Sequence, residues 1–221
     1  WLCNYFTAEW TAAFLEREPE SRKEKAINLA KQHGFLIKDI DVNTSGMRWE
    51  ILENDALVAP LTTIKGLGEK AIEQILANRP FKTVEEFIFN DNIVYSKLNK
   101  RALDVLCRAG ALRDLVDERF SGDKHFWSAV CVDRPRKPKN LEDNIETYYP
   151  EGSFTEEEII TNLTDLTGIF PMSKVVTPDV VERVEIAIEE GNADLVEQLL
   201  SELEIPDDAG LDEIQSSLEA D

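Results

Sequence analysis

The sequence has few of the residues that build metal centres and disulfide frameworks. It holds three cysteines, Cys3, Cys107 and Cys131, with no C-x-x-C pair, and two widely separated histidines, His33 and His125. An odd number of unpaired cysteines argues against structural zinc and against a disulfide framework, and it is typical of a reducing, cytoplasmic compartment. We expect Cys107 to lie in a core and both histidines to lie at the surface or half-buried.

Long apolar runs are lacking too. No stretch approaches the roughly 20 apolar residues that cross a bilayer, and no signal peptide is visible. The chain opens at Trp1 instead of Met, which suggests a fragment or a processed piece. Its 221 residues allow one or two domains with a real core.

Positive charge is scarce only in the last part of the chain. Residues 1–140 hold 22 Lys and Arg against 21 Asp and Glu, whereas residues 141–221 hold 2 against 23. The net charge of −20 therefore does not exclude nucleic acid as a partner, because a near-neutral body precedes a strongly acidic tail. Such a tail is most often a solvated face or a partner-binding arm.

The most informative stretch surrounds two glycines. Apolar residues lead into Gly66-Leu67-Gly68, and apolar residues at helical spacing follow. This pattern predicts a helix, a tight glycine turn and a second helix whose first N–H groups lack intrahelical partners. Such a helix start attracts anions, and we predict that it binds a nucleic-acid phosphate. The predicted phosphate-binding residues here are Lys65, Gly66, Leu67, Gly68, Glu69 and Lys70.

A second copy of this unit is predicted over residues 98–112, where a helical pattern ends at Gly110. Its Lys100 and Arg101 are predicted to face the same nucleic-acid strand. Two plainer interpretations stay open. A glycine turn between helices is often only an αα-hairpin, and a basic cluster is often only a solvated face.

The remaining patterns predict a mainly α fold in four regions. Residues 1–56 read as helices followed by a small β-hairpin, and residues 57–116 as tandem helix-hairpin-helix motifs. Residues 117–152 lose periodicity and are predicted to be a linker or loop. Residues 153–221 are predicted to form an acidic helical tail.

Local signals refine these regions. Ser21 and Thr83 are predicted to cap helices, each with Glu three residues later, and Ser153 or Thr155 is predicted to open another helix. The proline-broken basic run at residues 134–139 is predicted to be an extended linker or a loop that contacts phosphates.

In their order, several stretches resemble the α subunit of bacterial DNA polymerase III, the family C replicative polymerase. These stretches, which span roughly half the chain, are Trp10 to Leu15, Asp41 to Gly46, Ile64 to Ala71, Pro80 to Thr83, Leu98 to Leu103 and Ala109 to Ala111. The resemblance implies that the chain spans the end of the fingers and a tandem helix-hairpin-helix region that holds duplex DNA.

The resemblance also implies a neighbouring contact to the sliding clamp. Leu163, Leu166 and Phe170 are candidates for a clamp-binding peptide, although the customary glutamine is missing and an ordinary helix C-terminus explains them as well. From Val175 onward the tail does not resemble the family's oligonucleotide-binding or clamp-loader-binding regions, which, with its acidity, suggests a phage-like or divergent member.

No catalytic residue is assigned in this chain. Nucleotidyl transfer needs carboxylates that hold two metal ions, and the family's catalytic aspartates and their Mg²⁺ belong to a palm region outside this sequence. We therefore expect a DNA-binding, non-catalytic part of a replicative polymerase, with no cofactor of its own. Two alternatives remain: a helix-hairpin-helix accessory protein of DNA repair, and a protein-interaction adaptor that works through its acidic tail.

Overall fold

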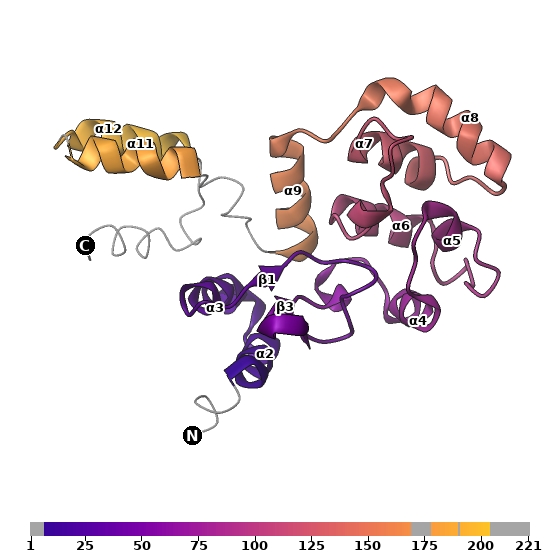
Figure 1. The fold of residues 1–221 in the computed structure, drawn as a ribbon, viewed down its shortest axis with the longest axis horizontal. Helices are drawn as coiled ribbons and strands as arrows, with labels where there is room; N and C mark the ends of the chain where they lie inside the picture. Colours follow the sequence, from indigo (N-terminus) through magenta and orange to yellow (C-terminus); the bar gives the residue numbers. More distant parts are fainter. Residues whose placement is uncertain (1–6, 169–177, 190, 204–221) are drawn as a thin grey trace. The chain divides into compact units, whose positions relative to one another are not determined.

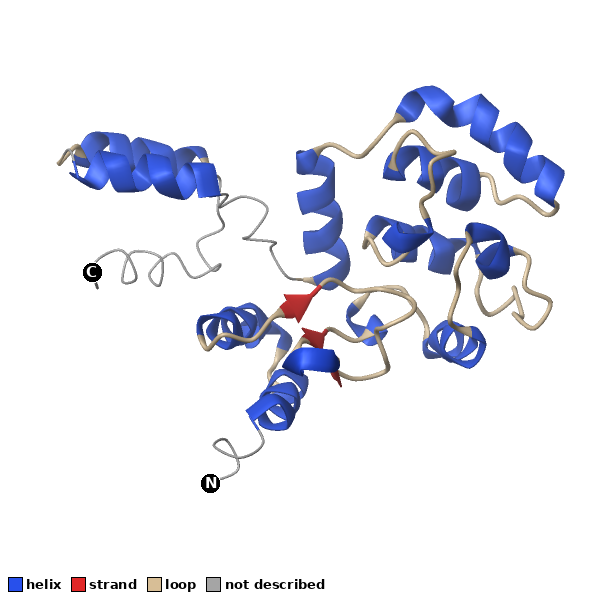
Figure 2. Cartoon of the chain, viewed as in Figure 1, coloured by secondary structure: helices blue, strands red, loops and turns tan. Residues whose placement is uncertain are grey.

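The computed structural model describes residues 7–168, 178–189 and 191–203. The chain divides into two compact units, residues 1–169 and residues 170–221. The described residues of both units are mainly helical (Figure 2), and those of the first also form a small sheet (Figure 1). The predicted fold class, mainly α with a small β element near the N-terminus, is confirmed. Within the described ranges, every helix is too short or too polar to cross a bilayer.

Two helices that pack against each other open the first unit, α2 (Thr7–Arg17) and α3 (Glu20–Gln32). Leu15 of α2 is fully buried in the core. Pro19 interrupts the helical pattern as predicted and is itself the N-cap of α3, without a side-chain hydrogen bond. The prediction that Ser21 caps this helix is wrong, because proline fixes φ in the helical range and the helix already begins one residue earlier.

Three short strands form the sheet: β1 (Ile37–Lys38), β2 (Glu50–Ile51) and β3 (Leu57–Val58). Their order is β1-β3-β2, with β1 parallel and β2 antiparallel to β3. The hairpin that is present joins β2 to β3 through the 3₁₀ turn η1 (Glu53–Asp55). It differs from the hairpin expected within residues 1–56, because β3 begins at residue 57 and lies between β1 and β2. The extended run near residue 37 adds the second edge. Both residues of β3 are buried, as a central strand requires.

The hairpin region follows. Its elements are η2 (Leu61–Thr63), α4 (Glu69–Asn78), α5 (Val84–Ile88), α6 (Lys100–Arg108) and η3 (Arg113–Leu115). They share one apolar core, in which the largest fully buried side chains include Leu61, Ile64, Ile72, Ile75, Phe87, Leu98, Leu103 and Leu106. Burial of this many aliphatic and aromatic groups holds the connecting loops in fixed positions.

Residues 117–152, predicted to be a linker, are instead a packed part of the first unit. They form α7 (Asp123–Phe126), η4 (Trp127–Val132), α8 (Pro138–Tyr148) and η5 (Tyr149–Glu151). The segment η4 is a π-helix, so its buried side chains do not recur at the α-helical spacing that sequence reasoning looks for.

His125 of α7 is fully buried and does not lie near the surface as expected. Its Nδ1 accepts a hydrogen bond from the N–H of Ser121 at 2.9 Å, and its Nε2 lies 2.8 Å from the carbonyl oxygen of Ile145. The imidazole is therefore a structural link between three segments. Cys107 is buried as predicted, and burial raises the pKa of its thiol.

The last helix of the first unit is α9 (Glu156–Thr167). Thr155 and Glu158 form a capping box at its start, as one of the two sequence options predicted, and Gly168 ends it in the left-handed conformation with φ 70°. Although α9 was assigned to the acidic tail, its Leu166 is buried in the same core as the hairpin region.

In the second unit the structure describes two acidic helices, α11 (Pro178–Glu189) and α12 (Ala193–Glu202). They pack against each other around Val184, Ala187 and Leu199. This small core confirms the helical character of the tail between residues 178 and 203.

Candidate nucleic-acid interface

The first hairpin loop, residues 64–68, is held in place by two apolar side chains. Ile64 is 1 % and Leu67 8 % exposed, and the N–H of Leu67 donates to the carbonyl oxygen of Ile64 at 3.1 Å. The intervening Gly66 has φ +88°, a left-handed conformation that side-chain-bearing residues rarely adopt. The sequence predicts a helix before this loop, but the structure has only the 3₁₀ turn η2 there. The backbone of Pro60, directly before η2, is in the extended conformation.

The loop leaves backbone N–H groups at the start of α4 open to solvent. Gly68 is the N-cap of α4 and has no side chain that could cap the helix. Within the part of the chain that the structure describes, the amides of Gly66, Gly68, Glu69 and Lys70 have no hydrogen-bond acceptor, and all four residues are exposed. Four exposed donors at the positive end of a helix form an arrangement that attracts anions.

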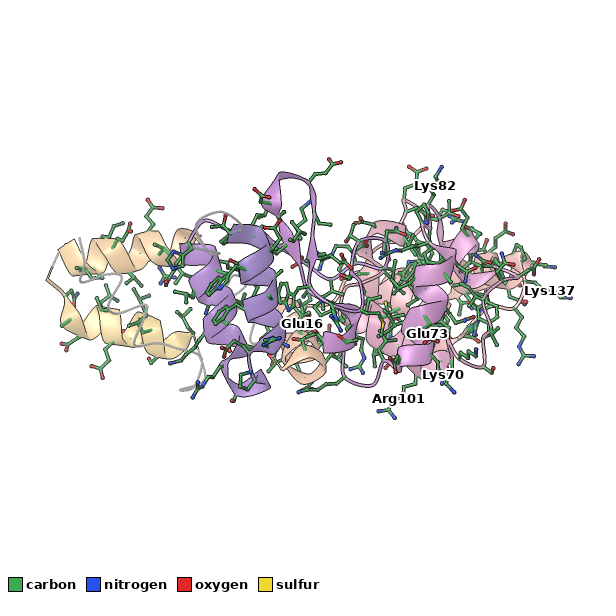
Figure 3. All side chains as sticks on the ribbon, turned by 90° about the horizontal axis from the view of Figure 1, so that it is seen from below. Glu16, Lys70, Glu73, Lys82, Arg101 and Lys137 are labelled. Carbon is green, nitrogen blue, oxygen red and sulfur yellow. The ribbon has the colours of Figure 1, made fainter. Side chains whose placement is uncertain are left out.

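Arg101 connects this loop to the second hairpin. A Cβ placed on Gly66 would lie 3.4 Å from both Nε and Nη2 of Arg101, so the first turn of α6 packs directly against the glycine. Lys65, Lys100 and Arg101 are all exposed. Figure 3 shows Lys70 and Arg101 on one edge of the unit, while Lys82 points from the opposite edge.

The structure therefore gathers the predicted loop residues and Arg101 on one surface. Leu67 belongs to this set only as an anchor, because its side chain is buried. Lys65 is fixed through its backbone as well, since its N–H donates to the carbonyl oxygen of Leu166 at 2.7 Å.

The second hairpin lies between α5 and α6, and its loop is residues 89–99. The glycine that was matched to the first hairpin, Gly110, instead follows α6 and ends it with φ +75°. The counterpart of Gly68 is Asn99, the N-cap of α6, whose Oδ1 accepts from the N–H of Ala102 at 3.0 Å. The second loop thus satisfies part of its own helix start.

The stretch from Asp41 to Gly46 is hydrogen-bonded to the segment that joins α4 to α5. Asn43 makes a pair of hydrogen bonds with the backbone of Phe81, through Nδ2 at 2.9 Å and Oδ1 at 2.7 Å, and Arg79 donates to the carbonyl oxygen of Ser45 at 2.8 Å. These bonds fix the connection between α4 and α5. Sequence reasoning missed this role of Asn43 and Arg79, although Asp41-x-Asn43 is a typical Asx-turn pattern.

The side chain of Asp41 organises this loop. Its Oδ1 accepts from the N–H groups of Asn43 at 2.8 Å and Thr44 at 3.1 Å. Burial raises the pKa of Asp41, the hydrogen bonds partly oppose this effect, and the net pKa lies above the usual value.

An ion cluster fastens α5. Arg119 reaches Glu85 at 2.7 Å and Asp117 at 2.6 Å. Burial raises the pKa of Glu85, but the hydrogen bond and charge of Arg119 outweigh burial, so that pKa lies below its usual value. The hydrogen bond from Arg119 also lowers the pKa of Asp117.

The candidate clamp-binding residues are placed differently from one another. Leu166 is 6 % exposed and belongs to the core, Leu163 is partly exposed, and Phe170 lies outside the described residues. The clamp-binding peptide stays a prediction, and the burial of Leu166 argues against it, because a docking side chain must be accessible. Among residues 7–168, 178–189 and 191–203, no group of three or more His, Cys, Asp or Glu is placed to hold a metal ion.

Known proteins match both the motif and its surroundings. A family described as a helix-hairpin-helix motif matches residues 34–121. The DNA polymerase III subunit alpha of Pseudomonas aeruginosa is 31% identical over 153 residues, which cover 66% of this chain and 13% of that protein. The subunit of Vibrio cholerae is 34% identical over 126 residues, covering 54% of this chain and 11% of that protein.

A third match reaches further along the chain. The DNA polymerase III subunit alpha of Haemophilus influenzae is 24% identical over 196 residues, covering 80% of this chain and 17% of that protein. The chain therefore corresponds to a small part of the length of each of these relatives.

Proposed function

We propose that this chain, which is related in sequence to the DNA polymerase III α subunits, is a DNA-binding and non-catalytic part of such a polymerase. In this proposal it holds duplex DNA by its phosphates during replication. The matches extend over 153 and 196 residues, well beyond the hairpins, and the proteins they reach are named as polymerase subunits. This extent favours a polymerase over a repair accessory protein that shares only the motif.

The observation that carries the proposal is the open start of α4. The amides of Gly66, Gly68, Glu69 and Lys70 belong to exposed residues and have no acceptor among the residues that the structure describes, and Arg101 lies beside Gly66. A phosphate at this position would receive backbone hydrogen bonds, the favourable end of the helix dipole and nearby positive charge. Glu69 contributes its N–H and not its carboxylate.

The type of contact suits a replicative enzyme. Hydrogen bonds from main-chain amides to phosphates hold the duplex in register but carry no sequence information. A protein that must pass along any sequence needs this kind of grip. The first unit, residues 1–169, holds 22 Lys and Arg against 29 Asp and Glu, a net charge of −7, so most of the net charge of −20 lies in residues 170–221. Attraction to a phosphate must come from the exposed cations beside the loop, because a nearby charge acts more strongly than the screened net charge of the unit.

The test is DNA binding by the full chain, measured as the fluorescence anisotropy of a labelled duplex at several salt concentrations. If the chain binds phosphates, its affinity should fall steeply as the salt concentration rises. The slope of log affinity against log salt concentration should be about −0.9 per phosphate contact. A folded chain that shows no salt-sensitive binding at low ionic strength would refute the proposal.

A substitution at Gly68 locates the contact. Gly68 has φ −76°, and an added Cβ would meet nothing within 4 Å, so the fold accepts a side chain there. In Gly68→Ser the hydroxyl would cap the amides that the phosphate needs, so we expect about tenfold weaker binding with unchanged or slightly higher stability. Gly68→Ala adds the Cβ without a capping oxygen and should lose less. Equal affinity in all three proteins would show that the amides do not bind phosphate.

A further inference from the structure

Residues 134–139 carry four basic side chains, at Arg134, Arg136, Lys137 and Lys139, interrupted by two prolines. The segment links η4 to α8 and has no part in the hairpin loops themselves. Of its four basic side chains, one is packed against other residues and three are exposed to solvent.

Arg134 is the packed one. Its guanidinium lies 3.7 Å from the ring centroid of Tyr95, and its Nη1 lies 3.5 Å from the carbonyl oxygen of Leu98. Tyr95 in turn donates to the carbonyl oxygen of Ile88, so the second hairpin loop, its preceding helix and the basic segment form one assembly. Arg134 therefore fixes the segment beside the start of α6, two residues before Lys100.

Arg136, Lys137 and Lys139 are exposed, and none has an ion-pair partner among the residues that the structure describes. The first turn of α8 contains no acidic residue. Positive side chains at a helix start oppose the helix dipole and lower the stability of the helix. An anionic partner would remove this cost.

We propose that Arg136, Lys137 and Lys139 are a third phosphate-binding element, which extends the contact made by the two hairpin loops along the same DNA duplex. This inference rests on the proposed function. DNA is the occupant because the segment is fastened to the loop that leads into Lys100 and Arg101, so a phosphate backbone held there continues past it. Figure 3 shows Lys137 at the far end of the unit, beyond Lys70 and Arg101.

The contact is electrostatic and made by side chains. Each lysine or arginine that neutralises a phosphate releases counterions and steepens the salt dependence of binding. The three free cations should therefore contribute to the slope, whereas Arg134 should act as a positioning residue through Tyr95.

The experiment compares two triple variants of the full chain with equal charge loss. One combines Arg136→Ser, Lys137→Ser and Lys139→Ser. The control combines Arg22→Ser, Lys25→Ser and Lys82→Ser. It removes three exposed cations, two on α3 and one on the opposite edge, that form no ion pair with any described residue. We expect the slope of log affinity against log salt concentration to become shallower by about 2 to 3 in the first variant and to stay unchanged in the control.

The outcomes separate the two proposals. If the unaltered chain shows no salt-sensitive binding, the proposed function itself fails. If it binds and Gly68→Ser weakens binding, but the two triple variants have the same slope, the hairpin grip stands and the third element is refuted. The same result follows if the basic segment instead pairs with the acidic tail, because DNA binding then does not depend on it.

A second readout is independent of net charge. An iron chelate attached at position 137, in a Lys137→Cys and Cys3→Ser protein, should cleave the bound duplex on one flank of the binding site. The chelate at Lys82→Cys in the same background should not cleave it. Cys107 and Cys131 are buried and so should not be labelled. Absence of cleavage from position 137, with DNA bound, would also overturn the proposal.

Discussion

The two hairpins begin their second helices in opposite ways. In the first, Gly68 leaves the first amides of α4 without an acceptor within the described part of the chain, whereas in the second the side chain of Asn99 accepts from the N–H of Ala102. The same helix start thus leaves donors open to an external anion in one copy and is satisfied by its own cap in the other. We infer that the first hairpin binds phosphate through its backbone and the second through the side chains of Lys100 and Arg101.

The loops also differ in how they are held. Loop 64–68 is short and depends on two buried side chains and on the carbonyl oxygen of Leu166 from α9. Loop 89–99 is longer and is held by the buried Ile93 and Leu98 and, in addition, by Tyr95 with Arg134. A short loop with a glycine at positive φ tolerates little change, whereas a long loop fastened by side chains can lose one contact and keep its shape.

The largest effect is expected at Gly66. In Gly66→Val a β-branched residue would have to adopt φ +88° with its Cβ 3.4 Å from Arg101. We expect the free energy of unfolding in urea to fall by about 2 kcal/mol and DNA affinity to fall more than about tenfold. Gly68→Val is the matched control, since its φ of −76° needs no left-handed conformation. Equal stability of the two variants would contradict this account of the loop.

The next largest effect separates the two basic residues at the start of α6. Arg101 lies against Gly66 and can contact a phosphate on the open amides, while Lys100 is not among the side chains nearest to Gly66. Arg101→Gln should therefore weaken duplex binding by about tenfold and Lys100→Gln by about twofold to threefold, measured by anisotropy at low salt. If Lys100→Gln costs more, the two hairpins do not share a phosphate.

Much of this comparison was accessible from sequence. The residues around Gly66 and Gly68 show their turn directly, and the caps at Thr83 and Thr155 follow from short-range patterns that the structure confirms at 3.2 Å each. Such features involve residues only a few positions apart, so both partners of each interaction can be recognised in a short stretch of sequence. The resemblance to the polymerase family rested on the same local stretches.

What sequence could not show depends on distant residues. Assigning Gly110 to a second glycine turn was reasonable because the residue does end a helix with positive φ, but the functional counterpart is a capping Asn99 at the other end of that helix. The contact between Arg101 and Gly66, and the bonds from Asn43 to Phe81, join segments more than 30 residues apart. The π-helix η4 hid a buried segment by breaking the α-helical period.

A smaller effect is expected from making the second hairpin resemble the first. Asn99→Gly removes the side chain that accepts from Ala102 and opens the start of α6. Because glycine is a tolerable N-cap, stability should fall by only about 0.3–0.5 kcal/mol, and DNA affinity should rise by up to about twofold. Asn99→Ser, which keeps a capping oxygen, should change neither. Unfolding in urea and duplex titration of the same three proteins give both quantities, and reduced affinity in Asn99→Gly would refute the division of roles.

The smallest effect concerns the ion cluster that fastens α5 to the second hairpin. Because Arg119 lowers the pKa values of Glu85 and Asp117, its contribution to stability is present above their usual values of 4.5 and 3.8 and is lost as the pH falls through the lowered ones. All three side chains are more than a third exposed or nearly so, so screening limits the contribution to about a few tenths of a kcal/mol. Arg119→Gln should therefore be slightly less stable than the unaltered chain in urea unfolding at pH 6, and the two should converge as the pH falls through the lowered pKa values of Glu85 and Asp117. The control is Arg22→Gln, which removes an exposed cation that forms no ion pair with the described residues. Its stability relative to the unaltered chain should not change with pH. A stability gap for Arg119→Gln that persists at low pH would mean that packing of the guanidinium, and not its charge, fastens α5.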